Sequence, residues 1–249
     1  PKPESPWLAF IVMLHVGSAV GLLIYFWRDW IAIIKAFFAT LGKRRVDTPT
    51  ERLAWLLIVA SIPTGILGIA LEHPARVATA KPLIASIFLV VNGLVLFVAQ
   101  RLSQRAEVRR LAGREGTKAD GGRVLDTLEY REAAGLGLAQ SGGLIAGISR
   151  DGMVMAAGVA RGLDNADAAR ISFLMATPII LAAGLYKIPD LTGPLGAGIR
   201  GYALLAAAVA AVTAVFTVHF LTRFFKRGNL YPFAIYGVVF GLAMVIYNA

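Results

Sequence analysis

Two adjacent residues, Ser149 and Arg150, have side chains suited to binding a phosphate, and Asp151 follows them. They lie in the segment GGLIAGISRDGMVMAAG, between two apolar, glycine-rich runs. The planar guanidinium of an arginine presents paired donors that match phosphate oxygens, and a helix beginning near Gly152 would add backbone N–H groups and the positive end of its dipole. Gly147 and Gly152 would let the backbone turn tightly and approach a ligand. We therefore predict an oxyanion cradle for a lipid phosphate, with Arg150, Ser149, Asp151, Gly147 and Gly152 as the residues at the ligand.

A purely structural interpretation of the same residues stays open at this level. Arg150 would then pair with Asp151 or Asp164 and stabilise a helical turn, while the glycines would serve close helix packing. The six-residue string GISRDG is too short to decide between the two interpretations.

The composition of the chain indicates a membrane protein. Of its 249 residues, 57% are hydrophobic and 16% are charged, and the mean hydropathy is +0.67. The net charge of +10 would also suit a nucleic-acid-binding protein, but the basic residues form short blocks between long apolar runs. That arrangement sets membrane topology, so we expect no nucleic-acid partner. The chain has no cysteine, which excludes disulfides and thiolate metal sites.

Apolar runs of about 20 residues are needed to cross a bilayer as helices. Six such runs predict an all-α polytopic membrane protein that forms one membrane domain over residues 1–249. They cover residues 7–27, 54–71, 82–100, 170–187, 201–222 and 231–248.

The segment 133–165, which contains the phosphate-binding candidates, has two apolar halves that are each too short to span about 30 Å of hydrocarbon. Basic blocks occur in three connections that we expect to be loops, at 28–52, 101–132 and 223–230. All three are cytoplasmic, as the positive-inside rule requires, only if the segment 133–165 enters and leaves on the same side. We therefore predict a re-entrant helical hairpin at 133–165, preceded by a basic cytoplasmic loop at 101–132.

This topology inverts the first three spans, within 7–100, relative to the last three, within 170–248. Inverted repeats place binding sites near the bilayer midplane between the two halves. An inverted pair should contain two re-entrant hairpins, and only one is present, so the other would precede Pro1.

Two further polar residues are candidates for substrate contact. His15 lies inside the first apolar run, where a hydrogen-bonded interior histidine is the simpler explanation. Gln140 lies in the hairpin, where its amide could bond to the opposite half-helix. No two of the three histidines are close in sequence, so we expect no metal site made by this chain.

The longer segment QSGGLIAGISRDGMVMAAGVARGLDNADAARISFLMATPIILAAG resembles the second conserved region of the undecaprenyl-diphosphate phosphatase family, also called the bacitracin-resistance proteins. FIVMLHVGSAVGLLIYFWRDW and IPTGILGIALE continue the resemblance over nearly the whole chain. The chain departs from the family pattern at Ala146, Asp151 and Val154, and at Gly237, where an arginine often follows the tyrosine. The family's first conserved region is expected before ESPWLAF and is lacking here.

The resemblance implies hydrolysis of undecaprenyl diphosphate to undecaprenyl phosphate and inorganic phosphate, which recycles the lipid carrier of cell-wall synthesis. It implies that Arg150 and Ser149 are the catalytic residues of this chain and hold the diphosphate. It also implies that a divalent cation, Mg²⁺ or Ca²⁺, takes part, and that the protein lies in the bacterial inner membrane. The expected partners are the polyprenyl diphosphate and membrane lipids, and the oligomeric state is left open. Two alternatives remain: a polyprenyl-phosphate flippase or transporter, because inverted repeats are common in transporters, and a catalytically incomplete fragment of the phosphatase.

Overall fold

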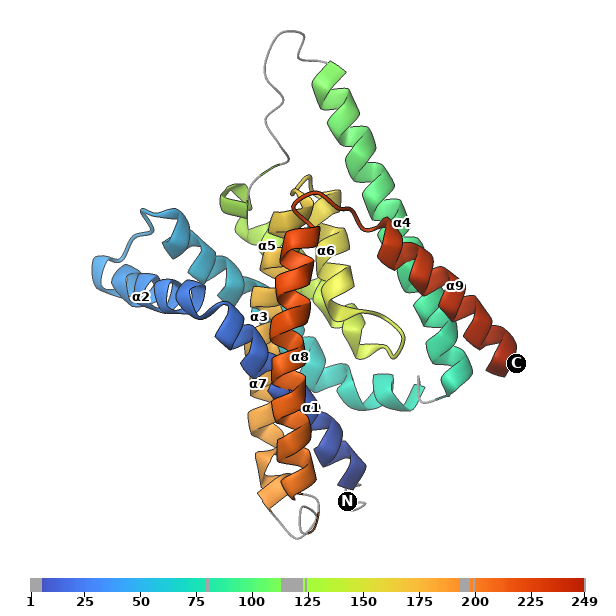
Figure 1. Ribbon diagram of the computed structural model, residues 1–249. Helices are drawn as coiled ribbons and strands as arrows, with labels where there is room; N and C mark the ends of the chain where they lie inside the picture. The colour runs from blue at the N-terminus through green and yellow to red at the C-terminus, as the bar shows by residue number, and fades with distance from the viewer. Residues whose placement is uncertain are drawn as a thin grey trace.

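The computed structural model describes residues 6–78, 81–112, 123, 125–192, 198 and 200–248. Within these ranges the regular elements are helices, and a single isolated bridge joins Arg123 to Leu163 (Figure 1). The long helices are α1 Pro6–Tyr25, α2 Trp27–Lys43, α3 Pro49–Ala78, α4 Pro82–Ala112, α7 Asn165–Thr192, α8 Arg200–Phe224 and α9 Tyr231–Asn248. The short ones are η1 Leu125–Thr127, α5 Tyr130–Ser141, η2 Gly142–Leu144 and α6 Arg150–Ala160.

Five described helices are long and apolar enough to cross a membrane, which confirms a helical, polytopic membrane protein. Their apolar stretches are Pro49–Leu71, Pro82–Arg105, Asn165–Leu185, Arg200–Phe224 and Tyr231–Asn248. Each overlaps one of the predicted runs. The remaining run, 7–27, falls on α1, whose apolar stretch Met13–Tyr25 is shorter.

The connection at 28–52 was expected to be a loop, and this expectation is wrong because α2 covers most of it. The charges of this segment lie on an amphipathic helix whose other side packs on α3. Ile33 is buried, and Trp55 donates a hydrogen bond from its indole nitrogen to Thr40 Oγ1 at 3.0 Å. Arg170 of α7 pairs with Asp29 and fixes the start of α2. Counting charges alone could not separate a basic loop from such a helix.

The predicted basic loop 101–132 also begins and ends in helices. Helix α4 continues to Ala112, and α5 begins at Tyr130. Residues 113–122 and 124 lie outside the described part.

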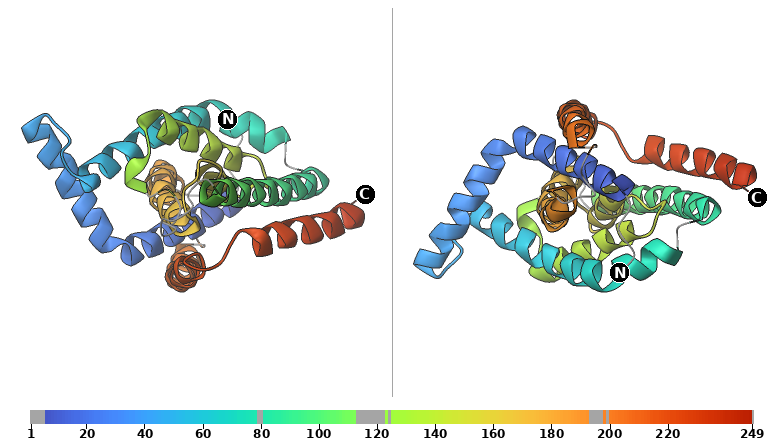
Figure 2. Two further views of the ribbon diagram at one scale, coloured as in Figure 1. Left: turned by 90° about the horizontal axis from the view of Figure 1, so that it is seen from above. Right: turned by 90° about the horizontal axis from the view of Figure 1, so that it is seen from below.

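The helices gather around a central group in which α1 packs along α8 and also along α7. Helix α3 packs on α5, and α4 pairs with α9 at one edge of the molecule (Figure 1). Figure 2 shows α2 at the opposite edge from α4 and α9.

Helices α4 and α9 approach each other closely where Gly237 of α9 lies against Gly93 of α4. A Cβ added to Gly237 would be 3.2 Å from the Gly93 Cα. A long side chain at 237, such as the arginine of the family pattern, would have to separate these helices.

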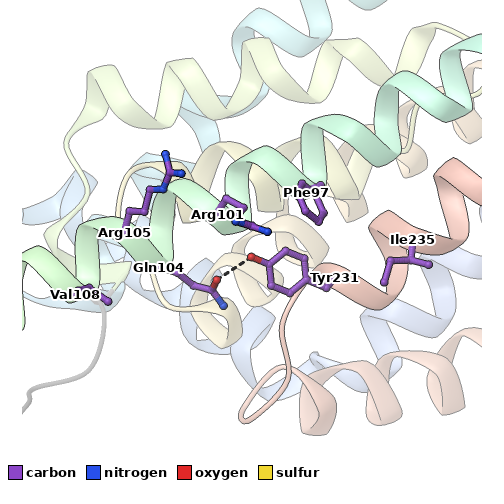
Figure 3. A pocket seen from close by; sticks show the side chains of 7 residues that line it. All are labelled: Phe97, Arg101, Gln104, Arg105, Val108, Tyr231 and Ile235. Carbon is purple, nitrogen blue, oxygen red and sulfur yellow. Dashed lines mark hydrogen bonds between the residues drawn. The ribbon is translucent and has the colours of Figure 1, made fainter.

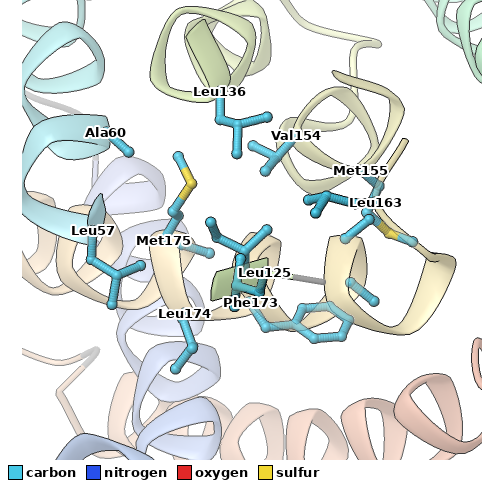
Figure 4. Packing of buried hydrophobic residues seen from close by; sticks show 14 of the residues in the cluster. Leu57, Ala60, Leu125, Leu136, Val154, Met155, Leu163, Phe173, Leu174 and Met175 are labelled. Atoms are coloured by element: carbon cyan, nitrogen blue, oxygen red, sulfur yellow. The ribbon is translucent and has the colours of Figure 1, made fainter. Parts of the chain in front are cut away.

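The buried core surrounds the predicted hairpin. Met175 of α7 points toward Leu136 of α5, and Val154 of α6 lies beside Leu136 (Figure 4). Leu174 of α7 and Leu57 of α3 belong to the same buried cluster. These side chains are nearly inaccessible to solvent. The short helices α5 and α6 are therefore held by apolar packing on α3 and α7, which leaves the turn between them free to carry polar groups.

Candidate functional site

The helices α5 and α6 form a hairpin whose two open ends are tied together. At 1.5 Å per residue, their 12 and 11 residues are about 18 and 16 Å long. Arg123 donates from its backbone N–H to Gly162 O at 2.7 Å, just beyond α6, and its guanidinium pairs with Glu132 of α5 at 2.7 Å. The hydrogen bonds from the Arg123 guanidinium lower the pKa of the Glu132 carboxyl from 4.5 to about 2. The start of α5 and the end of α6 thus lie side by side.

The turn between the two helices rests on α4. Gly147 has a φ of 96°, a conformation that favours glycine, and a Cβ built on it would be 2.0 Å from the carbonyl oxygen of Ala85. Gly147 therefore makes a close backbone approach to α4, and the approach to a ligand expected from the sequence stays a prediction. This contact fixes the position of the turn and of the residues that follow it.

Ser149 is the N-cap of α6. Its Oγ accepts a hydrogen bond from Gly152 N–H at 3.1 Å, and its own backbone N–H donates to Asn92 Oδ1 of α4 at 3.1 Å. The helix consequently starts at Arg150, two residues earlier than expected, because the serine side chain satisfies one of the free N–H groups of the first turn. The capped Oγ keeps its proton, so it remains able to donate a hydrogen bond.

Arg150 is partly buried at the first position of α6, and its stem packs against Gly143 across the turn. Among the described residues, no carboxylate oxygen comes within 4.0 Å of its guanidinium nitrogens. Asp164, one of the two partners considered from sequence, accepts a hydrogen bond from Asp167 N–H at the start of α7. In the described chain Arg150 therefore makes no ion pair within 4.0 Å with either carboxylate, and its interaction with Asp151 is through-space only.

Asp151, the residue after Arg150, borders a cavity that Arg150 does not line. Its Oδ1 is buried and lacks a hydrogen-bond partner in the described part of the chain. The side chain borders an apolar cavity of 810 Å³ between α1, α7 and α8, where Leu14 and Phe173 are among the lining residues. Ser172 Oγ of α7 donates to the backbone carbonyl of Asp151 at 3.1 Å. Arg150 and Asp151 are thus the first two residues of α6, and their charges still interact electrostatically.

The other two predicted residues have contacts away from this turn. Gln140 is buried, and its Oε1 accepts a hydrogen bond from Thr64 Oγ1 at 2.9 Å, so its described partner lies on α3 and not on the opposite half-helix. His15 is exposed on α1 and donates from Nδ1 to Ile11 O at 2.9 Å. A substrate contact for either residue remains a prediction.

Asn92 and Gly143 belong to the site and were not singled out from sequence. Asn92 is only 4% exposed and holds the backbone of Ser149. An asparagine in the middle of an apolar span is costly unless it is bonded, and this signal was available in the sequence. Gly143 provides the flat surface for the Arg150 stem, and nothing in its sequence context marks that role.

The arrangement combines an unpaired guanidinium, a hydroxyl able to donate and a helix N-terminus. These groups suit an oxyanion, and they supply no evident base. The described residues contain no group of three or more His, Asp or Glu side chains able to hold a metal ion.

Comparison with known proteins gives a family and several relatives. A family model described as "Bacitracin resistance protein BacA" matches residues 2–243. Undecaprenyl-diphosphatase of Mycolicibacterium paratuberculosis is 47% identical over 99% of this chain and 83% of that protein. Undecaprenyl-diphosphatase 2 of Frankia alni is 45% identical over 95% of this chain and 81% of that protein. Undecaprenyl-diphosphatase of Acidiphilium cryptum is 39% identical over 98% of this chain and 84% of that protein.

Proposed function

Since the chain belongs to the bacitracin resistance protein BacA family, we propose that it hydrolyses undecaprenyl diphosphate to undecaprenyl phosphate and inorganic phosphate. The reaction consumes one water and breaks the bond between the terminal phosphorus and the bridging oxygen. The lipid monophosphate returns to cell-wall synthesis as the carrier. The relatives that carry this activity in their names match the chain over most of its length.

The observation that carries the proposal is the free guanidinium of Arg150 beside a capped helix N-terminus. Negative charge moves onto the bridging and terminal oxygens as the phosphorus–oxygen bond breaks. A planar cation held by the Gly143 contact can pair with two of these oxygens, and it stabilises the transition state by charge and position without transferring a proton.

Ser149 acts as a hydrogen-bond donor in this proposal. Its Oγ lone pair is engaged by Gly152 N–H, while its proton is available to a phosphate oxygen. A nucleophilic role would need a neighbouring base.

The other predicted site residues are proposed to contact the substrate as well. Gly147 and Gly152 let the backbone N–H groups of the turn approach the diphosphate. Asp151, Gln140 and His15 are proposed to contact the substrate farther from the reacting phosphorus.

A requirement for a divalent cation also stays a proposal. Treatment with EDTA, followed by addition of Mg²⁺ or Ca²⁺, tests it directly. Recovery of turnover on addition of either ion supports the requirement, and full turnover in EDTA refutes it.

We further propose six spans and a re-entrant hairpin in the bacterial inner membrane, with 28–52, 101–132 and 223–230 on the cytoplasmic side. The tied ends of the hairpin support this topology, because Arg123 contacts both the start of α5 and the segment after α6. Each of the two short helices is also shorter than the hydrocarbon core.

Single cysteines test the topology, since the chain has none. Lys226 and Lys81 are both exposed and lie on opposite sides in this topology, whereas Gly228 is unsuitable because a Cβ there would meet the Phe224 ring at 2.6 Å. In intact cells, a membrane-impermeant thiol reagent should label Lys81→Cys and not Lys226→Cys. Labelling of Lys226→Cys from outside would mean that the hairpin crosses the membrane once.

Phosphate release by the purified protein from undecaprenyl diphosphate in detergent tests the activity. We expect one phosphate and one undecaprenyl phosphate for each substrate consumed. Movement of the lipid across reconstituted vesicles without phosphate release would instead identify a flippase and would refute the proposed hydrolysis.

A further inference from the structure

A groove between α4 and α9 lies away from the hairpin turn and has its own chemistry. It is about 820 Å³ in volume. Its lining residues, which define the α4–α9 groove, are Phe97, Arg101, Gln104, Arg105, Val108, Tyr231 and Ile235 (Figure 3). The α4 residues of the groove lie between Phe97 and Val108. Asn92, which holds Ser149 at the hairpin turn, is 11 residues before the middle of that range, or about 16 Å away along the helix axis.

Arg101 and Arg105 make this groove strongly basic. They are four residues apart and therefore share one side of α4, where two like charges repel each other. Both are exposed, and within the described part of the chain neither has a carboxylate within 4.0 Å. An anion between them would relieve the repulsion.

Aromatic and amide groups hold the geometry of the groove. Tyr231 donates its hydroxyl proton to Gln104 Oε1 at 2.7 Å, which ties α9 to α4 beside the arginines. The Arg101 guanidinium carbon is 5.2 Å from the centroid of the Phe97 ring, which in turn is 5.2 Å from the Tyr231 ring centroid. Leu230 N–H donates to buried Gln100 Oε1 at 3.1 Å. This bond fixes the start of α9 against α4 one helical turn before Gln104.

The groove lies where two membrane-spanning stretches meet the polar boundary. The apolar stretch of α4 ends at Arg105, and that of α9 begins at Tyr231. Phe97 and Ile235 therefore face the hydrocarbon side of the groove, while Arg101 and Arg105 lie toward the headgroups. Exposed Lys226 and Arg227, just before α9, add positive charge at the same end of that helix.

We propose that the α4–α9 groove binds an anionic glycerophospholipid of the surrounding membrane. The phosphate of the headgroup lies between Arg101 and Arg105, and an acyl chain runs along Phe97 and Ile235. Basic pockets between membrane helices on the cytoplasmic side bind phosphate-bearing headgroups in this way. This lipid is distinct from the substrate, whose diphosphate is assigned to the hairpin turn.

The test compares lipid retention by the intact protein and a charge variant. The protein is reconstituted with equal amounts of phosphatidylglycerol and phosphatidylcholine, re-extracted in a neutral detergent, and its bound lipid is measured by native mass spectrometry. We expect retained phosphatidylglycerol, and roughly 30-fold weaker retention in Arg101→Gln/Arg105→Gln, the factor expected for two cations near a membrane surface.

The matched control is Arg28→Gln/Lys35→Gln on α2. It also removes two exposed cations, and Arg28 likewise lies 5.2 Å from an aromatic ring centroid, that of Trp27, but outside the groove. We expect this control to retain phosphatidylglycerol as the unaltered protein does. Tyr231→Phe, which removes only the hydrogen bond to Gln104, should weaken retention by a smaller factor.

Three results would overturn the proposal. Equal retention of the two lipids would show that the arginines merely reach the polar boundary without selecting a headgroup. Equal loss of phosphatidylglycerol in the α2 control would show a nonspecific effect of net charge. Displacement of phosphatidylglycerol by millimolar inorganic phosphate would identify a site for free phosphate. Phosphate release in neutral detergent should be unchanged in the groove variant, which separates this proposal from the proposed hydrolysis.

Discussion

Arg150 and the arginines of the α4–α9 groove are both available to anions, but the surrounding backbone constrains them differently. The stem of Arg150 is partly buried against Gly143, directly after a serine cap, at the end of a turn that Gly147 fixes on α4. Arg101 and Arg105 project from the exposed side of one helix. The difference indicates that the hairpin holds a guanidinium in one orientation, whereas the groove presents positive charge that can adapt to its ligand.

The largest expected effect comes from Arg150→Lys. Lysine keeps the charge but loses the paired donors, so phosphate release should fall by about 100- to 1,000-fold, as for loss of one preorganised transition-state donor. Arg101→Lys should leave phosphate release unchanged and should retain most lipid binding, because a point charge suffices there.

Arg161→Lys is the matched control for Arg150→Lys, since Arg161 lies at the other end of α6 and is exposed. It should change turnover by less than about twofold, as for most surface substitutions. If Arg150→Lys retained full turnover while Arg150→Ala failed to fold, Arg150 would be a structural residue and the two regions would not differ as described.

Gly147→Ala should damage the hairpin next most severely. The added methyl would meet Ala85 O at 2.0 Å, and alanine is strained at a φ of 96°. We expect a loss of about 1–3 kcal/mol from the strained backbone alone, seen as a lower unfolding temperature in detergent, together with reduced turnover.

Gly237→Ala in the α4–α9 pair is the comparison variant for Gly147→Ala. Its methyl would lie 3.2 Å from Gly93 Cα, with an ordinary helical backbone, so a small shift of α9 accommodates it. Equal destabilisation by the two variants would contradict the view that the turn is the more constrained region.

Ser149→Ala should have a smaller effect than Arg150→Lys. It removes an N-cap worth about 0.5–2 kcal/mol and one donor to the phosphate, so turnover should fall by about tenfold. Ser149→Thr keeps the hydroxyl and should restore most of the activity. A loss in Ser149→Ala as large as that in Arg150→Lys would indicate that Ser149 is the nucleophile.

The smallest effect concerns the ion pair that ties the ends of the hairpin. The pKa of Glu132 is lowered from 4.5 to about 2 in the folded protein, so its stabilising contribution is complete above pH 4.5 and is lost as the pH falls toward 2. The unfolding temperature of the unaltered protein should therefore decline over this window more than that of Glu132→Gln. Asp47→Asn, which removes an exposed ion pair with Arg45, should decline as the unaltered protein does.

Helix boundaries could be predicted well where hydrophobicity alone decides them. The run 231–248 coincides with α9, and 201–222 lies within α8. The helix in the connection 28–52 could not be predicted from charge, because the burial of Ile33 and the packing of α2 on α3 are tertiary features. The partner of Gln140 could not be predicted either, since Thr64 is far away in sequence and reaches Gln140 only through the packing of α3 on α5.

The sequence by itself determined the membrane character, the apolar spans, the hairpin with a polar turn and the residues Ser149 and Arg150 at that turn. These follow from composition, from the length needed to cross a bilayer and from local chemistry. The tertiary structure alone decided that Arg150 has no carboxylate within 4.0 Å in the described chain, that Asp151 borders an apolar cavity, and that Asn92 supports Ser149. Such relations depend on how α4, α6 and α7 pack, and that packing is set by many weak apolar contacts between distant residues that no short motif contains.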